Sequence, residues 1–340
     1  MATIMVVGCG SIGSRHIRNL LALDQDVIAC DSAPECRAIC RRDYKVTVCD
    51  DMAAGLSTGC DGVIIASPSQ LHFEQTRLAL ENGKPVLVEK PVTTNLEDAI
   101  ALVDIAKEYS GILLNGFNMR FHPAIQWVKE MLVNDTIGKV FAMRAMAGYY
   151  LPDWHPETDY RLSYSANRSL GGGSLLDGIH ELDFIHYFFG SATQVFCIGG
   201  KLSNLEIDTE DMVELTLKTE NGVHLAVHMN YLNRTRQRDF QIIGEKGIIK
   251  WDSTDGKVRH FDADLQCWLV RDMDFEFHIN DTYMNEVRHF LDLVNGKATS
   301  LNDEREGLAT LAVVEAAKAS MASGENIDIR AFLESQGYGS

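Results

Sequence analysis

The sequence predicts an α/β protein with two domains, and three observations lead to this prediction. Up to about residue 118, short apolar runs alternate with amphipathic stretches, which is typical of a doubly wound parallel sheet covered on both faces by helices. From 193 to 270 strand patterns dominate, which indicates a mostly antiparallel, open sheet in an α+β second domain. The length of 340 residues suits two domains of ordinary size.

The first domain should contain six short strands and several helices between them. Residues 12–22 illustrate the helical pattern, because Ile12, Ile17 and Leu20 fall on one side of a helix. Continuous apolar runs of three to five residues mark the buried strands. We expect strands at 3–7, 26–30, 46–48, 63–66, 86–88 and 112–114, and helices at 12–22, 34–42, 70–82 and 95–109.

The pattern changes after residue 120, where the second domain should begin. We place the two domains at 1–119 and 120–340, with C-terminal helices that can pack back on the first domain. Asn221-Gly222 between two strand patterns predicts a hairpin, because both residues tolerate positive φ. We expect helices at 121–134, 174–189, 280–294 and 303–322, a strand at 138–147 and a long irregular loop at 148–173.

Composition and charge exclude several classes of protein. Apolar residues make up 46% of the chain and charged residues 23%, as in a globular protein. The net charge of −17 disfavours nucleic acid and anionic membranes as partners, so any anion must be bound in a local site. We find no secretory signal and no apolar run of the ~20 residues that span a bilayer. The eight cysteines lack the spacing of a zinc site, so we expect reduced thiols, no metal and a cytoplasmic protein.

A glycine-rich loop at residues 8–13 follows the first strand and opens the first helix, which is the context of a dinucleotide-binding loop. Asp31 ends the second strand, where a carboxylate can accept hydrogen bonds from ribose hydroxyls and would repel a 2′-phosphate. This favours NAD over NADP, although Arg37 lies close enough in sequence to bind a phosphate. The expected cofactor contacts in the loop are Gly8, Gly10, Ser11, Ile12 and Gly13.

Three later segments, taken with this loop, resemble the Gfo/Idh/MocA family of sugar and inositol dehydrogenases. The segments are 64–72 (Ile-Ile-Ala-Ser-Pro-Ser-Gln-Leu-His), 83–91, which ends in Glu-Lys-Pro, and 171–183 (Gly-Gly-Gly-Ser-Leu-Leu-Asp-Gly-Ile-His-Glu-Leu-Asp). Residues 117–123 look like the family's domain junction. The resemblance covers nearly the whole chain. It implies a Rossmann domain followed by a domain whose open sheet often forms a subunit interface, and hence a homodimer or homotetramer.

The resemblance also implies roles for individual residues. Ser67, Pro68 and His72 would line the cofactor, and Glu89 would lie near the nicotinamide ribose. Lys90 would reach the reacting hydroxyl or carbonyl group, turned toward it by the cis bond that the family often has before the matching proline. For the substrate we expect contacts from Asn118 at the junction and from Arg161 or Arg168 in the loop at 148–173, which mixes aromatic and polar residues.

Oxidation of a secondary alcohol needs a hydride acceptor and a base, and His180 is the expected base. Asp177 lies three residues earlier, on the same face if 174–189 is one helix, and can orient the imidazole or hold a substrate hydroxyl. In the commoner family pattern the two residues are four apart, so Asp183 is the alternative partner of His180. Lys90 can donate to the substrate oxygen and stabilise a developing alkoxide.

The leading hypothesis is therefore an NAD(P)-dependent dehydrogenase acting on a secondary hydroxyl or ketone of a sugar, a sugar derivative or a cyclitol. One alternative is redox-neutral cleavage of a glycoside, in which bound NAD oxidises and then re-reduces the same sugar. Another is a non-catalytic regulator that senses a dinucleotide. A sensor needs no proton-transfer groups, so the set of Lys90, Asp177 and His180 argues against it.

Overall fold

The structure is a computed structural model that describes residues 1–272 and 278–338. The chain forms two compact units. Unit 1 comprises Met1–Phe121 together with Ile279–Leu308, and unit 2 comprises His122–His278 together with Ala309–Ser340. The chain thus leaves unit 1 after the predicted first domain and later returns to it for one helix and the start of another.

Unit 1 is built on a six-stranded parallel sheet with the strand order β3-β2-β1-β4-β5-β6. Alternate residues of the central strand β1 enter two different hydrophobic cores, Met5 on one face and Ile4 on the other. This explains the continuous apolar runs, because both faces of the sheet are covered. The strands are β1 (Thr3–Val7), β2 (Asp26–Cys30), β3 (Thr47–Cys49), β4 (Gly62–Ile65), β5 (Val86–Glu89) and β6 (Leu113–Gly116).

The helices of unit 1 confirm most of the predicted ones, with two differences. The helix expected at 34–42 is α2 (Pro34–Ile39), which passes into a π-helical turn at Cys40–Tyr44. The sequence analysis missed α3 (Met52–Ser57), a six-residue helix that begins where the Asp51 carboxylate accepts the Ala54 N–H at 2.9 Å. The remaining helices are α1 (Ser11–Ala22), α4 (His72–Glu81), α5 (Leu96–Glu108) and the returning helix α9 (Ile279–Val294).

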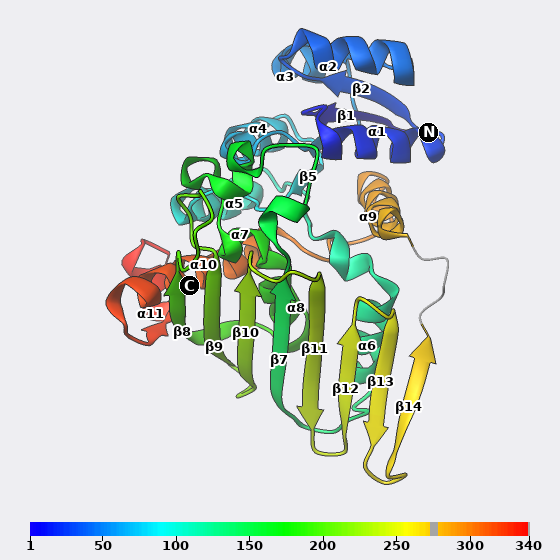
Figure 1. Ribbon diagram of the computed structural model, residues 1–340. Helices are drawn as coiled ribbons and strands as arrows, with labels where there is room; N and C mark the ends of the chain where they lie inside the picture. The colour runs from blue at the N-terminus through cyan, green and yellow to red at the C-terminus, as the bar shows by residue number, and fades with distance from the viewer. Residues whose placement is uncertain (273–277, 339–340) are drawn as a thin grey trace. The chain divides into compact units, whose positions relative to one another are not determined.

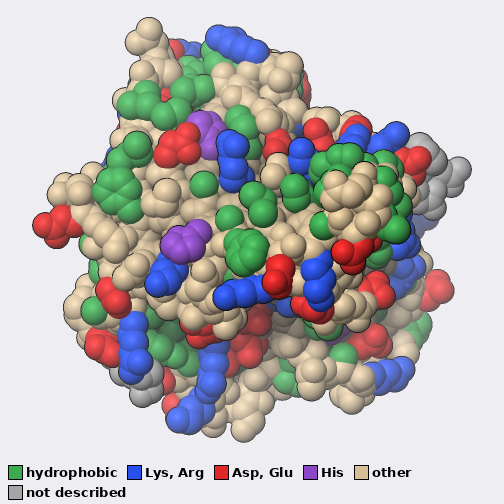
Figure 2. Space-filling model, turned by 90° about the horizontal axis from the view of Figure 1, so that it is seen from below, with side chains coloured by type: hydrophobic (Ala, Val, Ile, Leu, Met, Phe, Trp, Pro, Cys, Tyr) green, Lys and Arg blue, Asp and Glu red, His purple; other side chains and the backbone are tan. Residues whose placement is uncertain are grey.

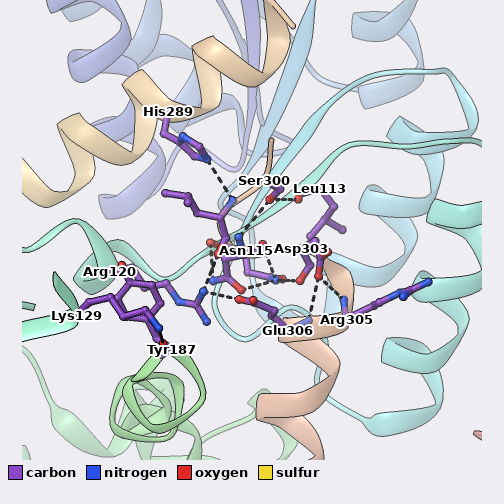
Figure 3. Close-up of polar contacts among 12 residues, drawn as sticks. Leu113, Asn115, Arg120, Lys129, Tyr187, His289, Ser300, Asp303, Arg305 and Glu306 are labelled. Atoms are coloured by element: carbon purple, nitrogen blue, oxygen red, sulfur yellow. Dashed lines mark hydrogen bonds and ion pairs between the residues drawn. The ribbon is translucent and has the colours of Figure 1, made fainter. Parts of the chain in front are cut away.

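The returning segment is tied into unit 1 by apolar and polar contacts. Phe290 of α9 is fully buried in the same core as Ile4. The backbone N–H of Asn115, in β6, donates to the carbonyl oxygen of Asn302 at 2.9 Å. The side-chain amide of Asn115 donates to the carbonyl oxygen of Asp303 at 2.5 Å (Figure 3). These bonds attach residues 300–303 to the end of the sheet.

Arg120 strengthens the same attachment from inside unit 1. Its guanidinium donates to the carbonyl oxygen of Leu301 at 2.7 Å and forms an ion pair with Glu306 (Figure 3). The Arg120 side chain is only 2% exposed, whereas that of Glu306 is 34% exposed. A guanidinium in such a place needs its acceptors, because burying a charge without partners is costly.

Unit 2 contains a nine-stranded sheet with the order β14-β13-β12-β11-β7-β10-β9-β8-β15. All neighbours are antiparallel except β7 and β10, which are parallel. Helices α6 (Pro123–Val133) and α8 (Ile179–Phe189) lie on one face of this sheet (Figure 1). The nine strands are β7 (Val140–Gly148), β8 (Ala192–Gly200), β9 (Met212–Thr219), β10 (His224–Asn230), β11 (Gln237–Gly244), β12 (Gly247–Asp252), β13 (Lys257–Asp262), β14 (Cys267–Asp272) and β15 (Ile327–Asp328).

The remaining parts of unit 2 include one confirmed turn and one long loop. The hairpin predicted at Asn221-Gly222 joins β9 and β10, with Gly222 at φ 78°. The loop at 149–173 contains four short 3-10 turns and no longer element. Helix α10 (Glu304–Ser323) begins in unit 1 and continues in unit 2, and α11 (Ile329–Ser335) follows it.

The prediction of one continuous helix at 174–189 is wrong. The segment is divided into α7 (Ser174–Asp177) and α8 by Gly178, whose φ and ψ are −80° and 13°. A Cβ atom at residue 178 would lie 2.3 Å from the sulfur of Met229, so a larger residue there would force the Met229 side chain of β10 to move. Glycine also weakens the helix at this point. Asp177 and His180 therefore do not lie on one continuous helix.

Charged side chains of both signs lie on the surface, as expected for a chain with 31 Lys and Arg and 48 Asp and Glu residues. On the face shown in Figure 2, acidic and basic side chains are interspersed rather than gathered into one field of either sign. No helix within the described ranges combines the length and the apolar character that a membrane crossing requires.

We predict that Arg120→Met lowers the free energy of unfolding by about 2–4 kcal/mol, because it removes a buried guanidinium together with its hydrogen bond to Leu301 and its ion pair with Glu306. Urea denaturation measures this. The control is Arg77→Met, which removes the exposed ion pairs with Glu74 and Glu81 on α4 and should cost much less. Equal losses in the two variants would contradict a stabilising role for the Arg120 contacts.

Candidate active site

The glycine loop of unit 1 has the shape that a dinucleotide phosphate requires. A Cβ atom on Gly13 would lie 1.8 Å from the carbonyl oxygen of Gly8, so only glycine allows α1 to pack this closely on the loop. A Cβ atom on Gly10 would meet nothing within 4 Å, which leaves open space beside the loop. No side chain caps α1, so the N–H groups of Ser11 and Ile12 at its first turn can meet a phosphate.

Asp31, directly after β2, is held beside this loop. One carboxylate oxygen accepts the backbone N–H of Cys9 at 2.7 Å, and the other accepts that of Ala33 at 2.8 Å. Arg37, which we considered as a phosphate ligand, donates instead to the carbonyl oxygens of Asp31 and Ser32 at 2.6 and 2.8 Å. A carboxylate at this strand end with the arginine engaged by carbonyls fits NAD.

The residues after β4 form a turn that a buried histidine braces. The two ring nitrogens of His72 lie 2.9 Å from the carbonyl oxygen of Ser67 and 2.8 Å from that of Pro91. Burial lowers the pKa of His72, and the two carbonyl contacts oppose that shift. Pro68 begins the short turn that leads into α4, and the Ser67 hydroxyl donates to Gln75 at 2.5 Å. His72 therefore joins the turn after β4 to the turn after β5.

The Glu89-Lys90-Pro91 segment lies at the end of β5, and the Lys90–Pro91 peptide bond is cis. Glu89 is 9% exposed, and its carboxylate lies 2.8 Å from Nε2 of His16 in α1. The sequence analysis did not identify His16, which follows the glycine loop by a few residues. Asn118, predicted to contact substrate, is buried and donates its amide to the Thr282 hydroxyl at 2.7 Å.

In unit 2, a carboxylate fixes the start of the helix that carries Asp177. Glu210 accepts the Leu175 backbone N–H of α7 at 3.1 Å, and burial raises the pKa of this carboxyl group. A Cβ atom on Gly173 would lie 2.3 Å from a Glu210 carboxylate oxygen, and Gly173 has a φ of 118°. The last glycine of the Gly-Gly-Gly motif is thus required by both space and conformation.

Two tyrosines hold the Asp177 carboxylate, and the sequence analysis missed this role for both. The Tyr231 hydroxyl donates to one carboxylate oxygen at 2.5 Å, and the Tyr164 hydroxyl donates to the other. Burial, with the nearby charge of Asp177, raises the pKa of Tyr231 well above its usual value, so the phenol stays a donor. Two donors on two oxygens suit an ionised carboxylate. Tyr164 lies in the loop that the sequence marked as aromatic and polar.

His180 and its possible carboxylate partners lie on or next to α8. His180, near the start of this helix, is 9% exposed, and Asp183 one turn later is fully buried. The pairing of His180 with Asp177 or Asp183 stays a prediction. With Lys90 in unit 1 and both Asp177 and His180 in unit 2, the predicted catalytic residues come from both units.

The two arginines expected to bind a charged substrate are engaged in other contacts. Arg161 forms ion pairs with Asp159 at 2.7 Å and with Glu206 at 3.1 Å on an exposed surface. Arg168 donates to the carbonyl oxygen of Asp208 at 2.9 Å. Either guanidinium would have to exchange these partners before it could bind a substrate anion. The charge of Arg161 is thus balanced by two carboxylates, whereas the Arg168 guanidinium donates to a neutral carbonyl group.

Comparison with known proteins agrees with this architecture. A family model described as an oxidoreductase family with an NAD-binding Rossmann fold matches residues 2–117, and a model of the GFO/IDH/MocA C-terminal domain matches residues 125–250. D-glucoside 3-dehydrogenase of Escherichia coli K12 is 24% identical over 96% of this chain and 97% of its own length. A 2,7-anhydro-N-acetylneuraminate hydratase of the same organism is 27% identical over 75% of this chain and 71% of its own length.

Among solved structures, levoglucosan dehydrogenase in complex with NADH shares the fold. Its TM-score is 0.89 at 20% identity, with 96% of this chain and 99% of the other covered. The glycine loop, the Asp31 carboxylate and the motifs of both units fit this family, and the cofactor is NAD. The chain belongs to the Gfo/Idh/MocA family and is an NAD-dependent oxidoreductase.

Proposed function

We propose that the protein transfers a hydride between NAD and a secondary hydroxyl or ketone group of a sugar, a sugar derivative or a cyclitol. The observation that carries this proposal is the placement of Lys90. It follows β5, which lies between β4 and β6 in the cofactor-binding sheet, and histidines contact the residues on either side of it. Relatives named as sugar dehydrogenases support the substrate class.

The proposed residues account for the proton as well as for the charge on the reacting oxygen. NAD, when bound, supplies the hydride acceptor. As the substrate C–H bond breaks and the C=O bond forms, His180 accepts the hydroxyl proton. Lys90 donates a hydrogen bond to the substrate oxygen and stabilises its developing negative charge. Asp177, held by Tyr164 and Tyr231, either orients His180 or accepts a hydrogen bond from a neighbouring substrate hydroxyl.

We predict that Lys90→Ala and His180→Ala each lower kcat by about 10²–10⁴-fold, because each removes a proton donor or acceptor. A panel of sugars and cyclitols with NAD, followed by the absorbance of reduced nicotinamide, identifies the substrate and measures kcat. His155→Gln is the control, since this side chain is 73% exposed in unit 2 and carries no proposed role. Full turnover by either alanine variant on a confirmed substrate would rule out the proposed mechanism.

A second prediction concerns the coenzyme. Asp31→Asn should lower kcat/KM for NAD by about tenfold or more and improve use of NADP, because the carboxylate both accepts ribose hydroxyls and repels a 2′-phosphate. Initial rates with each coenzyme give the ratio. The matched control is Asp26→Asn at the exposed start of the same strand, which should leave the ratio unchanged. An unaltered ratio in Asp31→Asn would place coenzyme selection elsewhere.

Redox-neutral chemistry is the second candidate, and the relative named as a hydratase is the observation in its favour. In such a reaction the same residues would serve, but the hydride would return to the sugar. The discriminating measurement is stoichiometry: product formed from a glycoside or anhydro-sugar with no net NADH supports this candidate. One NADH for each product supports the dehydrogenase.

We also propose that the chain forms a homodimer or homotetramer through the sheet of unit 2 in the cytoplasm. Glu214, Thr216 and Lys218 alternate as exposed residues along β9, on a face that also carries Ala226. All eight cysteines are free thiols, which suits a reducing compartment.

Ala226→Arg should therefore lower the mass measured by light scattering, because it introduces a bulky charge into the proposed interface. Lys201→Ala, which lies just beyond the end of β8, is the control and should keep the mass of the original protein. An unchanged mass in Ala226→Arg, or a monomeric parent protein, would contradict this interface.

A further inference from the structure

Three buried ionisable side chains of unit 1 meet behind the end of β5. His16 comes from α1, Glu89 from β5 and Glu286 from α9. One nitrogen or oxygen of each lies within 4.8 Å of the corresponding atoms of the other two. His16 and Glu286 are fully buried and Glu89 is 9% exposed. Of the three, the sequence motifs assign a role to Glu89 alone, which we expect near the nicotinamide ribose.

The two ring nitrogens of His16 differ in their contacts. Nε2 lies 2.8 Å from a Glu89 carboxylate oxygen. Nδ1 of His16 is buried and has no hydrogen-bond partner within the described part of the chain. A proton on Nδ1 would be a buried donor without an acceptor, which is costly. The geometry therefore favours the tautomer in which His16 donates its Nε2–H to the Glu89 carboxylate.

Other titratable groups surround the cluster. The ring of Tyr283 lies edge-on to His16 at 5.9 Å between centroids, and the Arg15 guanidinium lies 4.5 Å from the centre of the Tyr283 ring. Burial and the charges of Glu89 and Glu286 raise the pKa of Tyr283, so it stays neutral. Lys90 and His72 also lie close enough to interact electrostatically with these groups. The charge of Lys90 lowers the pKa of Tyr283, and the charge of Glu89 raises that of His72.

The cluster is joined directly to the proposed catalytic lysine. Glu89 is the last residue of β5 and Lys90 follows it, so a contact that holds the Glu89 side chain also restrains the backbone from which Lys90 extends. On the other side of Lys90, the Pro91 carbonyl oxygen contacts His72 at 2.8 Å. We propose that His16 and Glu286 are positioning residues for Lys90, which they hold in place through Glu89. This inference rests on the proposed function of Lys90.

The test compares substitutions that keep or remove the donor to Glu89. His16→Leu should lower kcat about tenfold or more, because a small misplacement of a catalytic group is costly in rate. Because Glu89 is also placed near the nicotinamide ribose, the substitution should weaken NADH binding, measured by fluorescence titration, but by a smaller factor than it lowers kcat. His16→Gln, whose amide N–H can replace the imidazole Nε2–H, should restore most of kcat. Glu286→Leu should resemble His16→Leu.

The control variant is Asn19→Leu. Asn19 is a buried polar residue on the same helix, and it accepts a hydrogen bond from Asn280 of α9 at 2.9 Å without touching Glu89. It should lower the melting temperature and leave kcat unchanged. Full kcat in His16→Leu, or no rescue by His16→Gln, would overturn the inference. So would equal losses of kcat in Asn19→Leu and His16→Leu.

A second readout does not depend on turnover. The ¹⁵N spectrum of His16 in the NAD-bound protein should show a proton on Nε2 that is hydrogen-bonded to Glu89. A ring with no proton on Nε2 would overturn the proposed contact. The outcomes also separate this inference from the proposed function. Turnover retained in Lys90→Ala overturns the function of Lys90, whereas loss in Lys90→Ala with full turnover in His16→Leu overturns only the positioning role.

Discussion

The parallel direction of the strands in the unit 1 sheet is the constraint on which the cofactor side of the site depends. Because all strands run in one direction, their carboxyl ends meet at one edge. The glycine loop follows β1, Asp31 follows β2, Ser67 follows β4 and Lys90 follows β5. Each of these groups begins at most two residues beyond the last paired residue of its strand, so the sheet itself sets their spacing.

The sheet fixes where each strand ends but not the conformation of the turns that follow. Buried polar contacts fix these turns. His72 joins the turns after β4 and β5, and Asn115 binds the returning segment beyond β6. In a low-dielectric interior a polar group that leaves its partner loses a hydrogen bond and gains no water, which leaves few alternative arrangements. His72, which we expect to line the cofactor, therefore also orders this edge, whereas Asn115 orders it without a proposed ligand contact.

The fold was predictable from the sequence where burial leaves a strong pattern. Strands covered on both faces read as unbroken apolar runs, so every strand of unit 1 was found to within a few residues. Helix α3 was missed because six residues are too few to show a helical period. The break at Gly178 was missed for another reason. Gly178 lies close to the sulfur of Met229 in β10, and no local pattern reports a contact with a distant strand.

The same distinction applies to the candidate site. Lys90, Asp177 and His180 stand in motifs that are continuous in the sequence, so the family resemblance could point to them. Tyr231 and His16 stand in no motif, and each becomes significant only through a partner brought close by folding, Asp177 or Glu89. Groups that act on other side chains are recognised through tertiary contacts, whereas groups that act on ligands recur in local motifs. For this chain, the sequence is therefore the better guide to the chemistry, and the structure is the better guide to what holds the reacting groups in place.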